Sequence, residues 1–312
     1  MSFRLFIYYC AICGGWAALA GWALGRQLAP SGGVERAAVK GLFLGLAVAL
    51  GVGLVDALSV ASLRRPSEVL MRVVLAVVVG CLGGWLGGTV GEHYHSRTTD
   101  PTVKAAFLVA GWAITGLLIG AAVSTFDLLT TLARRQDGHG ARRKLRNGLL
   151  GGVIGGAIGG ALLLLIEAAR VPFFEGKGRN ALWSPTALGF IVLGLAIGLL
   201  IGLAQVLLRE AWVRVEAGFR AGRELILSKP EVTIGRAEAC DIGLFGDPTI
   251  ERLHARIVRR DAGYYLDDAG TPGGTFLNDV RIARPTPIRS GDVIRVGNSV
   301  LRFGERVKKK GA

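Results

Sequence analysis

The C-terminal part of the chain holds the residues whose types and spacing could do chemistry. Four short motifs follow one another there: TIGR at 233–236, ERLHA at 251–255, GGTFLND at 273–279 and SGDVIRVG at 290–297. Three arginines lie in or beside them, Arg236, Arg252 and Arg256. Guanidinium groups bind phosphate and carboxylate through paired, charge-assisted hydrogen bonds. These three arginines are therefore candidates for an anion-binding site.

No enzyme signature accompanies these arginines. The sequence has no phosphate-binding P-loop, no protein-kinase motif set and no nucleophile elbow with triad partners. We expect a binding protein without catalytic residues, cofactor or resident metal ion. One metal alternative stays open at Glu92, His93 and His95, because alternate residues of an extended loop can share an ion, although three ligands are few.

The elements that must position the motifs are short strands. Residues 224–304 contain apolar and polar residues in alternation, as in Val232 to Ile234 and Val293 to Val296. Turn residues such as Asp261-Ala262-Gly263 and the glycine-rich stretch 270–274 separate these runs. Many short strands without an intervening helix predict an all-β sandwich.

In this order and spacing the motifs resemble the forkhead-associated (FHA) domain, a reader of phosphothreonine peptides. The matches to the family's motifs are Gly235-Arg236 to its Gly-Arg, residues 251–255 to its Ser-Arg-x-His-Ala, residues 271–279 to its Ser-x-Asn-Gly-Thr-x-x-Asn-Gly and residues 291–297 to its closing Gly-Asp-x-Ile-x-x-Gly. The resemblance covers residues 224–304. It implies a β-sandwich that binds proteins.

The resemblance also implies residue roles. Arg236 would bind phosphate or position the peptide, whereas Glu251 replaces the family's phosphate-binding serine and Gly273 replaces the asparagine that holds the peptide main chain. The candidate peptide- or phosphate-binding residues are Arg236, Glu251, Arg252, Gly273, Gly274 and Thr275. Gly235, His254 and Asn278 would structure the binding loops.

Glu251 sets two hypotheses against each other. A phosphothreonine carries about −1.5 to −2 charges near neutral pH, so a carboxylate beside it is repulsive. We expect Glu251 to pair with Arg236 or Arg252 instead, which would fill the pocket and make the phosphothreonine site degenerate. The alternative is that Arg236, Arg252 and Arg256 together outweigh one carboxylate, and that the domain reads phosphothreonine.

The first two thirds of the chain have the composition of a membrane protein. The chain has 47 glycines, 51% hydrophobic residues and a mean hydropathy of +0.46. Six apolar runs are long enough to cross a bilayer. They lie near residues 5–25, 38–60, 70–91, 105–131, 148–168 and 187–208. A signal peptide is the alternative for the first run.

These runs and strands predict a multi-domain chain. We expect an all-α transmembrane bundle of six helices over 1–208, a juxtamembrane helical linker over 209–223, the FHA-like sandwich over 224–304 and a basic tail over 305–312. The basic residues of the tail either contact anionic lipid headgroups or remain solvated.

The net charge of +14 points to nucleic acid or to anionic lipid. Aromatic residues are not interleaved with the positive charges as stacking on bases requires, so we expect no nucleic-acid partner. The densest basic cluster, Arg134 to Arg146, lies in the fourth connection between apolar runs. The positive-inside rule then places the termini and the C-terminal domain in the cytoplasm, beneath a plasma or bacterial inner membrane.

Glycine spacing predicts how the helices pack. Glycine-rich first helices starting near Gly14, Gly80 and Gly151 suggest three two-helix repeats. In 148–168, glycines at 151, 155 and 159 form one line and those at 152, 156 and 160 form a second. Small residues four apart let helices approach closely, so this helix should touch two neighbours, within the chain or in a homo-oligomer. A glycine-lined pore is the alternative.

Three acids in the apolar runs are the remaining candidates for chemistry. Asp56, Asp127 and Glu167 lie near predicted helix ends, and Asp56 and Asp127 are followed by the arginine pairs 64–65 and 134–135. We expect ion pairing near the headgroups, with a proton- or ion-coupled role as the alternative. The sequence therefore predicts a membrane-anchored adaptor or signalling protein, with a transporter or channel regulated by its FHA domain as the competitor.

Overall fold

The computed structural model describes residues 2–60, 66–133, 139–169, 184–218, 221–227, 229–260 and 263–306. Its contacts divide the chain into two compact units. The helical unit comprises Arg4–Arg134 and Arg142–Leu207, and the sandwich unit comprises Met1–Phe3, Arg135–Ala141 and Leu208–Ala312.

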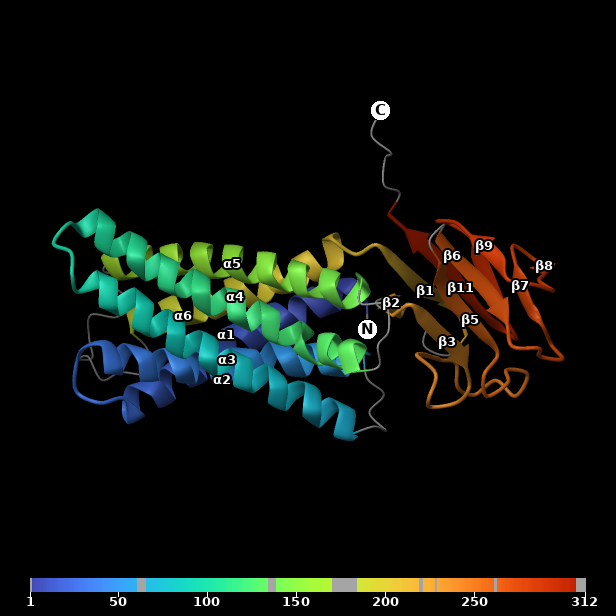
Figure 1. Ribbon diagram of the computed structural model, residues 1–312, viewed down its shortest axis with the longest axis horizontal. Coiled ribbons are helices and arrows are strands. Elements are labelled where there is room, and N and C mark those ends of the chain that lie inside the picture. Colours follow the sequence, from blue (N-terminus) through green and yellow to red (C-terminus); the bar gives the residue numbers. More distant parts are fainter. Residues whose placement is uncertain are drawn as a thin grey trace, which may run out of the picture. The chain divides into compact units, whose positions relative to one another are not determined.

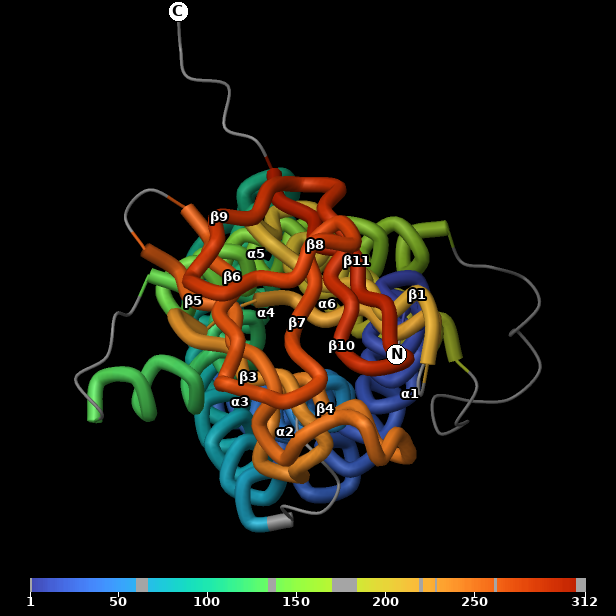
Figure 2. The backbone as a smooth tube through the Cα atoms, turned by 90° about the vertical axis from the view of Figure 1, so that its right-hand side faces the viewer, coloured from blue at the N-terminus to red at the C-terminus, as the bar shows by residue number. Residues whose placement is uncertain are grey.

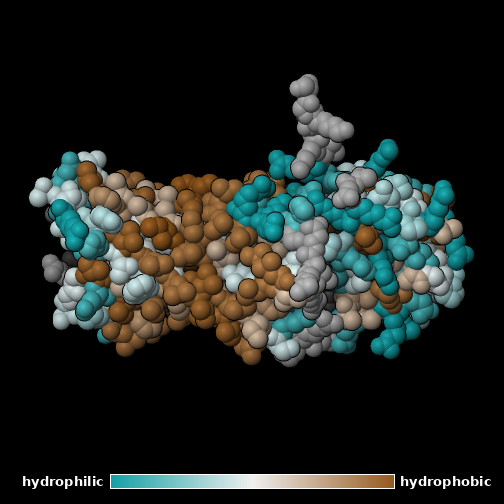
Figure 3. Space-filling view, viewed as in Figure 1, coloured by the Kyte–Doolittle hydropathy of each residue, from teal (hydrophilic) through white to brown (hydrophobic). Residues whose placement is uncertain are grey.

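The described residues of the helical unit form six long helices, which lie side by side (Figure 1). They are α1 (Phe3–Leu28), α2 (Gly33–Val60), α3 (Pro66–His95), α4 (Pro101–Ala133), α5 (His139–Ala168) and α6 (Pro185–Leu207). Each is long and apolar enough to cross a membrane, and hydrophobic residues cover most of this unit's visible surface (Figure 3). The six expected helices are confirmed.

Local sequence explains where α4 starts. Pro101 is its first residue, a position where the missing N–H costs nothing. The carboxylate of Asp100 accepts hydrogen bonds from the backbone N–H of Thr102 at 2.7 Å and of Val103 at 3.3 Å. Such an N-cap satisfies donors that have no partner within the helix.

Glycines let neighbouring helices approach to backbone contact. A Cβ added at Gly45 of α2 would collide with the carbonyl oxygen of Gly80 in α3. The same holds for Gly120 of α4 against Gly148 of α5, and for Gly198 of α6 against Cys10 of α1. Close backbone approach also occurs between α3 and α4 at Gly87, so it is general to the unit, and the three two-helix repeats stay a prediction.

The two glycine lines of α5 pack against two different helices. Gly151 and Gly155 lie against Leu200 and Ile197 of α6, whereas Gly152 lies against Gly116 of α4. The prediction that this helix touches two neighbours is confirmed. Both partners belong to the same chain, so a homo-oligomer stays a prediction that these glycines do not support.

The interior of the helical unit is mostly apolar, with a few buried polar side chains such as Thr115 and Gln205. Helix α2 also contacts α4 and α6. Val48 of α2, Ile119 of α4 and Ile197 of α6 are each 0% exposed. Among the described residues, the glycines within the helices, away from their first turns, face neighbouring backbone and side chains, so the alternative of a glycine-lined pore finds no support in these contacts.

The possible metal ligands on α3 are arranged differently from the expectation. Glu92, His93 and His95 lie in the last turn of a helix and not in an extended loop. Residues two apart on a helix do not face each other, which explains why the alternation does not bring the two imidazoles together. Within the described ranges, no group of three or more His, Cys, Asp or Glu side chains could hold a metal ion.

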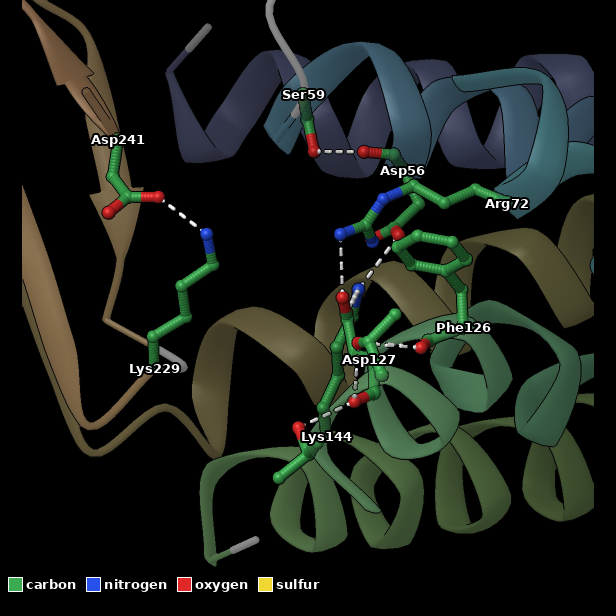
Figure 4. Close-up of polar contacts among 10 residues, drawn as sticks. Asp56, Ser59, Arg72, Phe126, Asp127, Lys144, Lys229 and Asp241 are labelled. Atoms are coloured by element: carbon green, nitrogen blue, oxygen red, sulfur yellow. Dashed lines mark hydrogen bonds and ion pairs between the residues drawn. The ribbon is translucent and has the colours of Figure 1, made fainter. Parts of the chain in front are cut away.

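Four charged side chains meet at one end of the helical unit (Figure 4). Asp127 of α4 accepts from Arg72 of α3 at 2.7 Å and from Lys144 of α5 at 2.9 Å. Lys144 also donates to Asp56 of α2 at 2.7 Å. No side chain of this ionic tetrad is more than 17% exposed. The guanidinium carbon of Arg72 also lies 4.4 Å from the centre of the Phe126 ring. The tetrad therefore ties four helices together.

The ion pairs that the structure describes for Asp56 and Asp127 involve cations of neighbouring helices. The arginine pairs that follow these acids in the sequence, residues 64–65 and 134–135, lie outside the described residues, so pairing with them stays a prediction. The structure pairs both acids with Lys144, and Asp127 also with Arg72. Antiparallel packing brings the end of one helix beside the start of the next, so cations from other helices reach the carboxylates. Glu167, the third acid, is exposed.

The sandwich unit contains two packed sheets (Figure 2). Its strands are β1 (Ala211–Ala217), β2 (Glu224–Ile226), β3 (Glu231–Gly235), β4 (Ile242–Gly243), β5 (Ala255–Arg260), β6 (Gly263–Asp268), β7 (Thr275–Leu277), β8 (Val280–Arg281), β9 (Thr286–Ile288), β10 (Val293–Val296) and β11 (Ser299–Glu305). The orders are β2-β1-β11-β10-β7-β8 and β4-β3-β5-β6-β9. Alternating residues of both sheets, among them Ile257 and Phe303, bury a shared apolar core. The expected sandwich is confirmed.

The predicted helical linker over 209–223 is wrong. Residues 211–217 form β1, which pairs with β11 through Val213 and Phe303, and with β2. Ala211, Val213 and Val215 are buried, whereas Arg214 and Glu216 are exposed. This period of two is typical of a half-buried strand. At the other end, β11 extends to Glu305, and residues 307–312 of the predicted tail lie outside the described part.

Candidate peptide-binding edge

Three loops that carry the candidate residues lie at one edge of the sandwich. The first joins β3 to β4, the second joins β4 to β5 and the third joins β6 to β7. The backbone N–H of Arg236 donates to the carbonyl of Glu251 at 3.0 Å, and that of Ala237 donates to the carbonyl of Arg252 at 3.0 Å. A Cβ added at Gly235 would collide with this Arg252 carbonyl. Gly235 thus permits the contact that joins the first two loops.

His254 connects the second loop to the third. Its Nδ1 accepts from the backbone N–H of Glu251 at 3.1 Å, so the proton of the neutral ring is assigned to Nε2. Nε2 lies 3.2 Å from the carbonyl oxygen of Gly274 and 3.1 Å from the hydroxyl of Thr271. The imidazole is 0% exposed. This geometry supports the expected bracing role of His254.

Asp268, at the end of β6, fixes the third loop and was not singled out in the sequence. Its carboxylate accepts from the hydroxyl of Thr275 at 2.6 Å, from the hydroxyl and N–H of Thr271 at 3.0 Å each and from the N–H of Gly270 at 2.9 Å. Burial raises the pKa of Asp268, but the hydrogen bonds from Thr275, Thr271 and Gly270 outweigh it, so its pKa lies below the ordinary value. The sequence signal was an Asp two residues before a glycine in a turn.

The candidates in the third loop separate into buried and exposed residues. Thr275 is 0% exposed and donates to Asp268, so it supports the loop from inside and does not face a ligand. Gly274 is also buried and has a φ of +66°, which glycine adopts without strain. Gly273 is exposed. Because Gly273 has no side chain, the space that the family's asparagine side chain would occupy is empty of protein atoms from this residue.

Asn278 structures the adjoining β7–β8 hairpin. Asn278 and Asp279 have φ values of +50° and +64°, which is the backbone of a two-residue type I′ turn. The Asn278 amide oxygen accepts from the N–H of Val293 at 2.9 Å, and its amide nitrogen donates to Asp292 at 2.9 Å. These bonds attach the hairpin to the SGDVIRVG segment and support the role expected for Asn278.

Glu251 does not form the expected ion pair. Its side chain is exposed, as are those of Arg236 and Arg252, and none of the three takes part in an ion pair within the described residues. The backbone N–H and C=O of Glu251 are both hydrogen-bonded to other loop residues. An ion pair between exposed, solvated side chains adds little free energy of stabilisation, so little draws the Glu251 carboxylate to the arginines. Among the described residues, Glu251 therefore does not fill the pocket through an ion pair with Arg236 or Arg252. Arg256, the third arginine of the alternative, pairs with Glu231 at 3.3 Å.

Comparisons with known proteins agree with this architecture. The family model of the FHA domain matches residues 232–297. The FHA domain-containing protein FhaB of Mycobacterium tuberculosis is 29% identical over 126 residues, which cover 40% of this chain and 81% of FhaB. The oxoglutarate dehydrogenase inhibitor of Corynebacterium diphtheriae is 36% identical over 92 residues, which cover 29% of this chain and 62% of that protein.

Solved structures also resemble the C-terminal part. One, described as a structural and functional analysis of phosphothreonine-dependent FHA domain interactions, is 24% identical with a TM-score of 0.29 and covers 32% of this chain and 99% of its own. Another is the FhaA FHA domain complexed with the intracellular domain of Rv3910, 25% identical with a TM-score of 0.27, covering 30% and 98%. From the family model, the motifs and the two-sheet fold, we conclude that residues 232–297 of this chain belong to an FHA domain.

Proposed function

We propose that this protein is a membrane-embedded interaction protein whose FHA domain binds a phosphothreonine-containing segment of a partner. FHA domains are interaction modules for such partners, and the relative FhaB is an FHA domain-containing protein. The observation that carries the proposal is the pair of exposed guanidinium groups of Arg236 and Arg252, which have no ion-pair partner among the described residues. Their loops are joined by backbone hydrogen bonds, so both residues start from one edge of the sandwich.

Charge balance at this edge favours a phosphorylated ligand in spite of Glu251. A phosphate bound here would be attracted by two guanidinium groups and repelled by one carboxylate. Unit charges about 4 Å apart interact by about 1–4 kcal/mol at a solvated protein surface. Two attractive interactions of this size exceed one repulsive interaction at a similar distance. Glu251 then weakens phosphate binding without preventing it. This is why we favour the phosphothreonine reader over the degenerate site.

The helical unit supports a membrane location. We propose that residues 1–208 anchor the protein in a lipid bilayer and that the FHA domain, extended by β1, faces the cytoplasm. The basis is the six apolar helices and the basic cluster between Arg134 and Arg146. Reporter fusions after Glu305 and within residues 97–100 test the orientation. Cytoplasmic reporter activity at the first position and none at the second is expected, and the reverse would contradict the topology.

The binding proposal is tested with the full-length chain in lipid nanodiscs. The probes are fluorescent peptides from a degenerate library with a fixed central phosphothreonine, together with their unphosphorylated counterparts. We expect phosphate-dependent binding that Arg236→Met and Arg252→Met each weaken by at least about tenfold, because each removes a charge-assisted hydrogen bond. Arg284→Met, at an exposed arginine of the β8–β9 connection, is the matched control. Equal affinity for both peptide sets would overturn the proposal.

A further inference from the structure

The binding edge lacks one donor and has an arginine beside the gap. Gly273 carries no side chain, and a Cβ added there would meet nothing closer than the Thr249 carbonyl at 3.7 Å. The next residue, Gly274, lies directly beneath the guanidinium of Arg281, since a Cβ added at Gly274 would collide with Arg281 Nε. Arg281 belongs to β8, which the β7–β8 hairpin folds back onto this loop.

Arg281 is held in place and keeps donors for a ligand. Its Nη2 donates to the carbonyl oxygens of Pro272 at 3.2 Å and of Thr271 at 3.4 Å. The Arg281 side chain is exposed and forms no ion pair in the described part of the chain. Asp279, in the turn before β8, pairs with Arg295 instead, with 3.6 Å between Asp279 Oδ1 and Arg295 Nε. A guanidinium carries five N–H donors, and the donors on Nη1 make no hydrogen bond to the described residues.

Hydrogen bonds connect Arg281 with the phosphate-facing arginines. Arg281 is bonded to the loop that ends at Gly274, and the Gly274 carbonyl meets His254 Nε2. His254 Nδ1 accepts from Glu251, and the Glu251 carbonyl accepts from Arg236. The Arg281 side chain and the loop that begins with Arg236 are thus linked through hydrogen bonds along one edge.

We infer that Arg281 supplies the ligand-binding donor that Gly273 lacks, and that it selects a phosphothreonine peptide with a neighbouring acidic side chain. The inference rests on the proposed function and adds the class of peptide. An amide at position 273 would bind main-chain carbonyls regardless of sequence. A guanidinium binds carboxylates more strongly, through a charge-assisted fork, and therefore reads side-chain charge.

The test uses full-length protein in nanodiscs and a defined peptide series. Each peptide has a central phosphothreonine in an alanine background, with one aspartate placed at one of the four positions on either side. A matched peptide has asparagine at the same position. We expect at least one position where wild type prefers aspartate by about tenfold, the size of one charge-assisted hydrogen bond. Arg281→Met should abolish this preference, and Arg284→Met should leave it unchanged.

Two further variants separate ligand binding from loop support. Gly273→Asn in the Arg281→Met background should raise affinity for aspartate and asparagine peptides alike, without restoring the preference. Arg281→Lys should retain part of it, because the charge remains and the planar fork is lost. If Arg281→Met weakens both peptides equally, Arg281 only supports the loop and the inference is overturned. If wild type binds no phosphothreonine peptide, the proposed function itself fails.

Discussion

The two units of this protein use charge in opposite ways. In the helical unit, Arg72 and Lys144 are mostly buried and each has a carboxylate within 2.9 Å. At the edge of the FHA domain, Arg236 and Arg252 are exposed and have no carboxylate partner in the described residues. A buried charge without a partner is costly, whereas an exposed one is solvated. Pairing therefore distinguishes the charges that hold helices together from those available to a ligand.

The tetrad is an expensive way to join helices. Removing two acids and two cations from water costs several kcal/mol per ion, and replacement by apolar residues often costs little. Arg72 is not fully satisfied, since its Nε and Nη1 are buried without a hydrogen-bond partner, although its guanidinium lies against Phe126. Coulombic attraction thus determines which helix ends pack together. Apolar surfaces do not provide this specificity in lipid, because they are as favourable against lipid tails as against one another.

The largest expected effect comes from breaking the tetrad. Lys144→Met leaves Asp56, 7% exposed, without its cation and should destabilise the helical unit by about 3–5 kcal/mol. Denaturant unfolding in detergent measures this. Arg36→Met, at an exposed arginine of α2, is the matched control and should change little. Adding Asp56→Asn should recover part of the loss, and two independent, additive effects would contradict the coupling.

The second effect tests whether backbone contact carries the remaining packing. Gly120→Val places a side chain against the Gly148 carbonyl and should destabilise α4–α5 packing by about 1–3 kcal/mol or more. Gly32→Val is the control, because a Cβ added at Gly32 meets nothing within 4 Å. Thermal unfolding in detergent compares the two. Equal loss in both would mean that general glycine replacement, and not this contact, is responsible.

The third effect sharpens the contrast at the FHA edge by removing its one carboxylate. Glu251→Ser should raise affinity for phosphothreonine peptides by about tenfold, since it removes repulsion and adds a hydroxyl donor. Glu251→Gln separates these contributions by removing the charge without adding the hydroxyl. Fluorescence anisotropy at several salt concentrations measures both. Unchanged affinity in both variants would show that Glu251 lies away from the phosphate.

The smallest effect concerns a carboxylate that supports the edge from within. The pKa of Asp268 is lower in the folded protein than in the unfolded chain, so the unfolded state binds more protons and stability rises with pH in that window. The stabilisation is present above the unfolded pKa, near 4, and is lost as pH falls through the folded value. Hydrogen-exchange protection factors in residues 269–275, corrected for the intrinsic pH dependence of amide exchange, should therefore fall in acid. Asp268→Asn should remove this dependence, and an identical acid response would contradict it.

The sequence predicted the parts of the fold that local patterns determine. Long apolar runs gave the six helices, and the glycine lines of α5 gave two neighbours, because both depend on residues close in sequence. β1 was missed because its partner Phe303 in β11 lies far along the chain from Val213. The tetrad partners were missed for the same reason, since Lys144 reaches Asp56 across helices.

The candidate site shows the same limit. Motif matching located the loops, but the role of each candidate residue depends on whether its side chain is buried or exposed. Motif matching could not show that Thr275 faces inward to Asp268, or that the Glu251 side chain is exposed to solvent. Arg281 was not singled out because nothing in its own neighbourhood marks it. Its contact with Gly274 depends on the type I′ turn at Asn278 and Asp279.

The place of β1 in its sheet has a practical consequence for producing the FHA domain as a fragment. Recombinant boundaries drawn at residues 232–297 would discard β1 and β11, which are adjacent in the middle of the six-stranded sheet. The fragment would lose the fully buried side chains of Val213 and Phe303 and expose the hydrogen-bonding groups of β10. Such a fragment is expected to aggregate, because unpaired strand edges pair with other chains. A fragment spanning residues 209–306 retains every strand of both sheets.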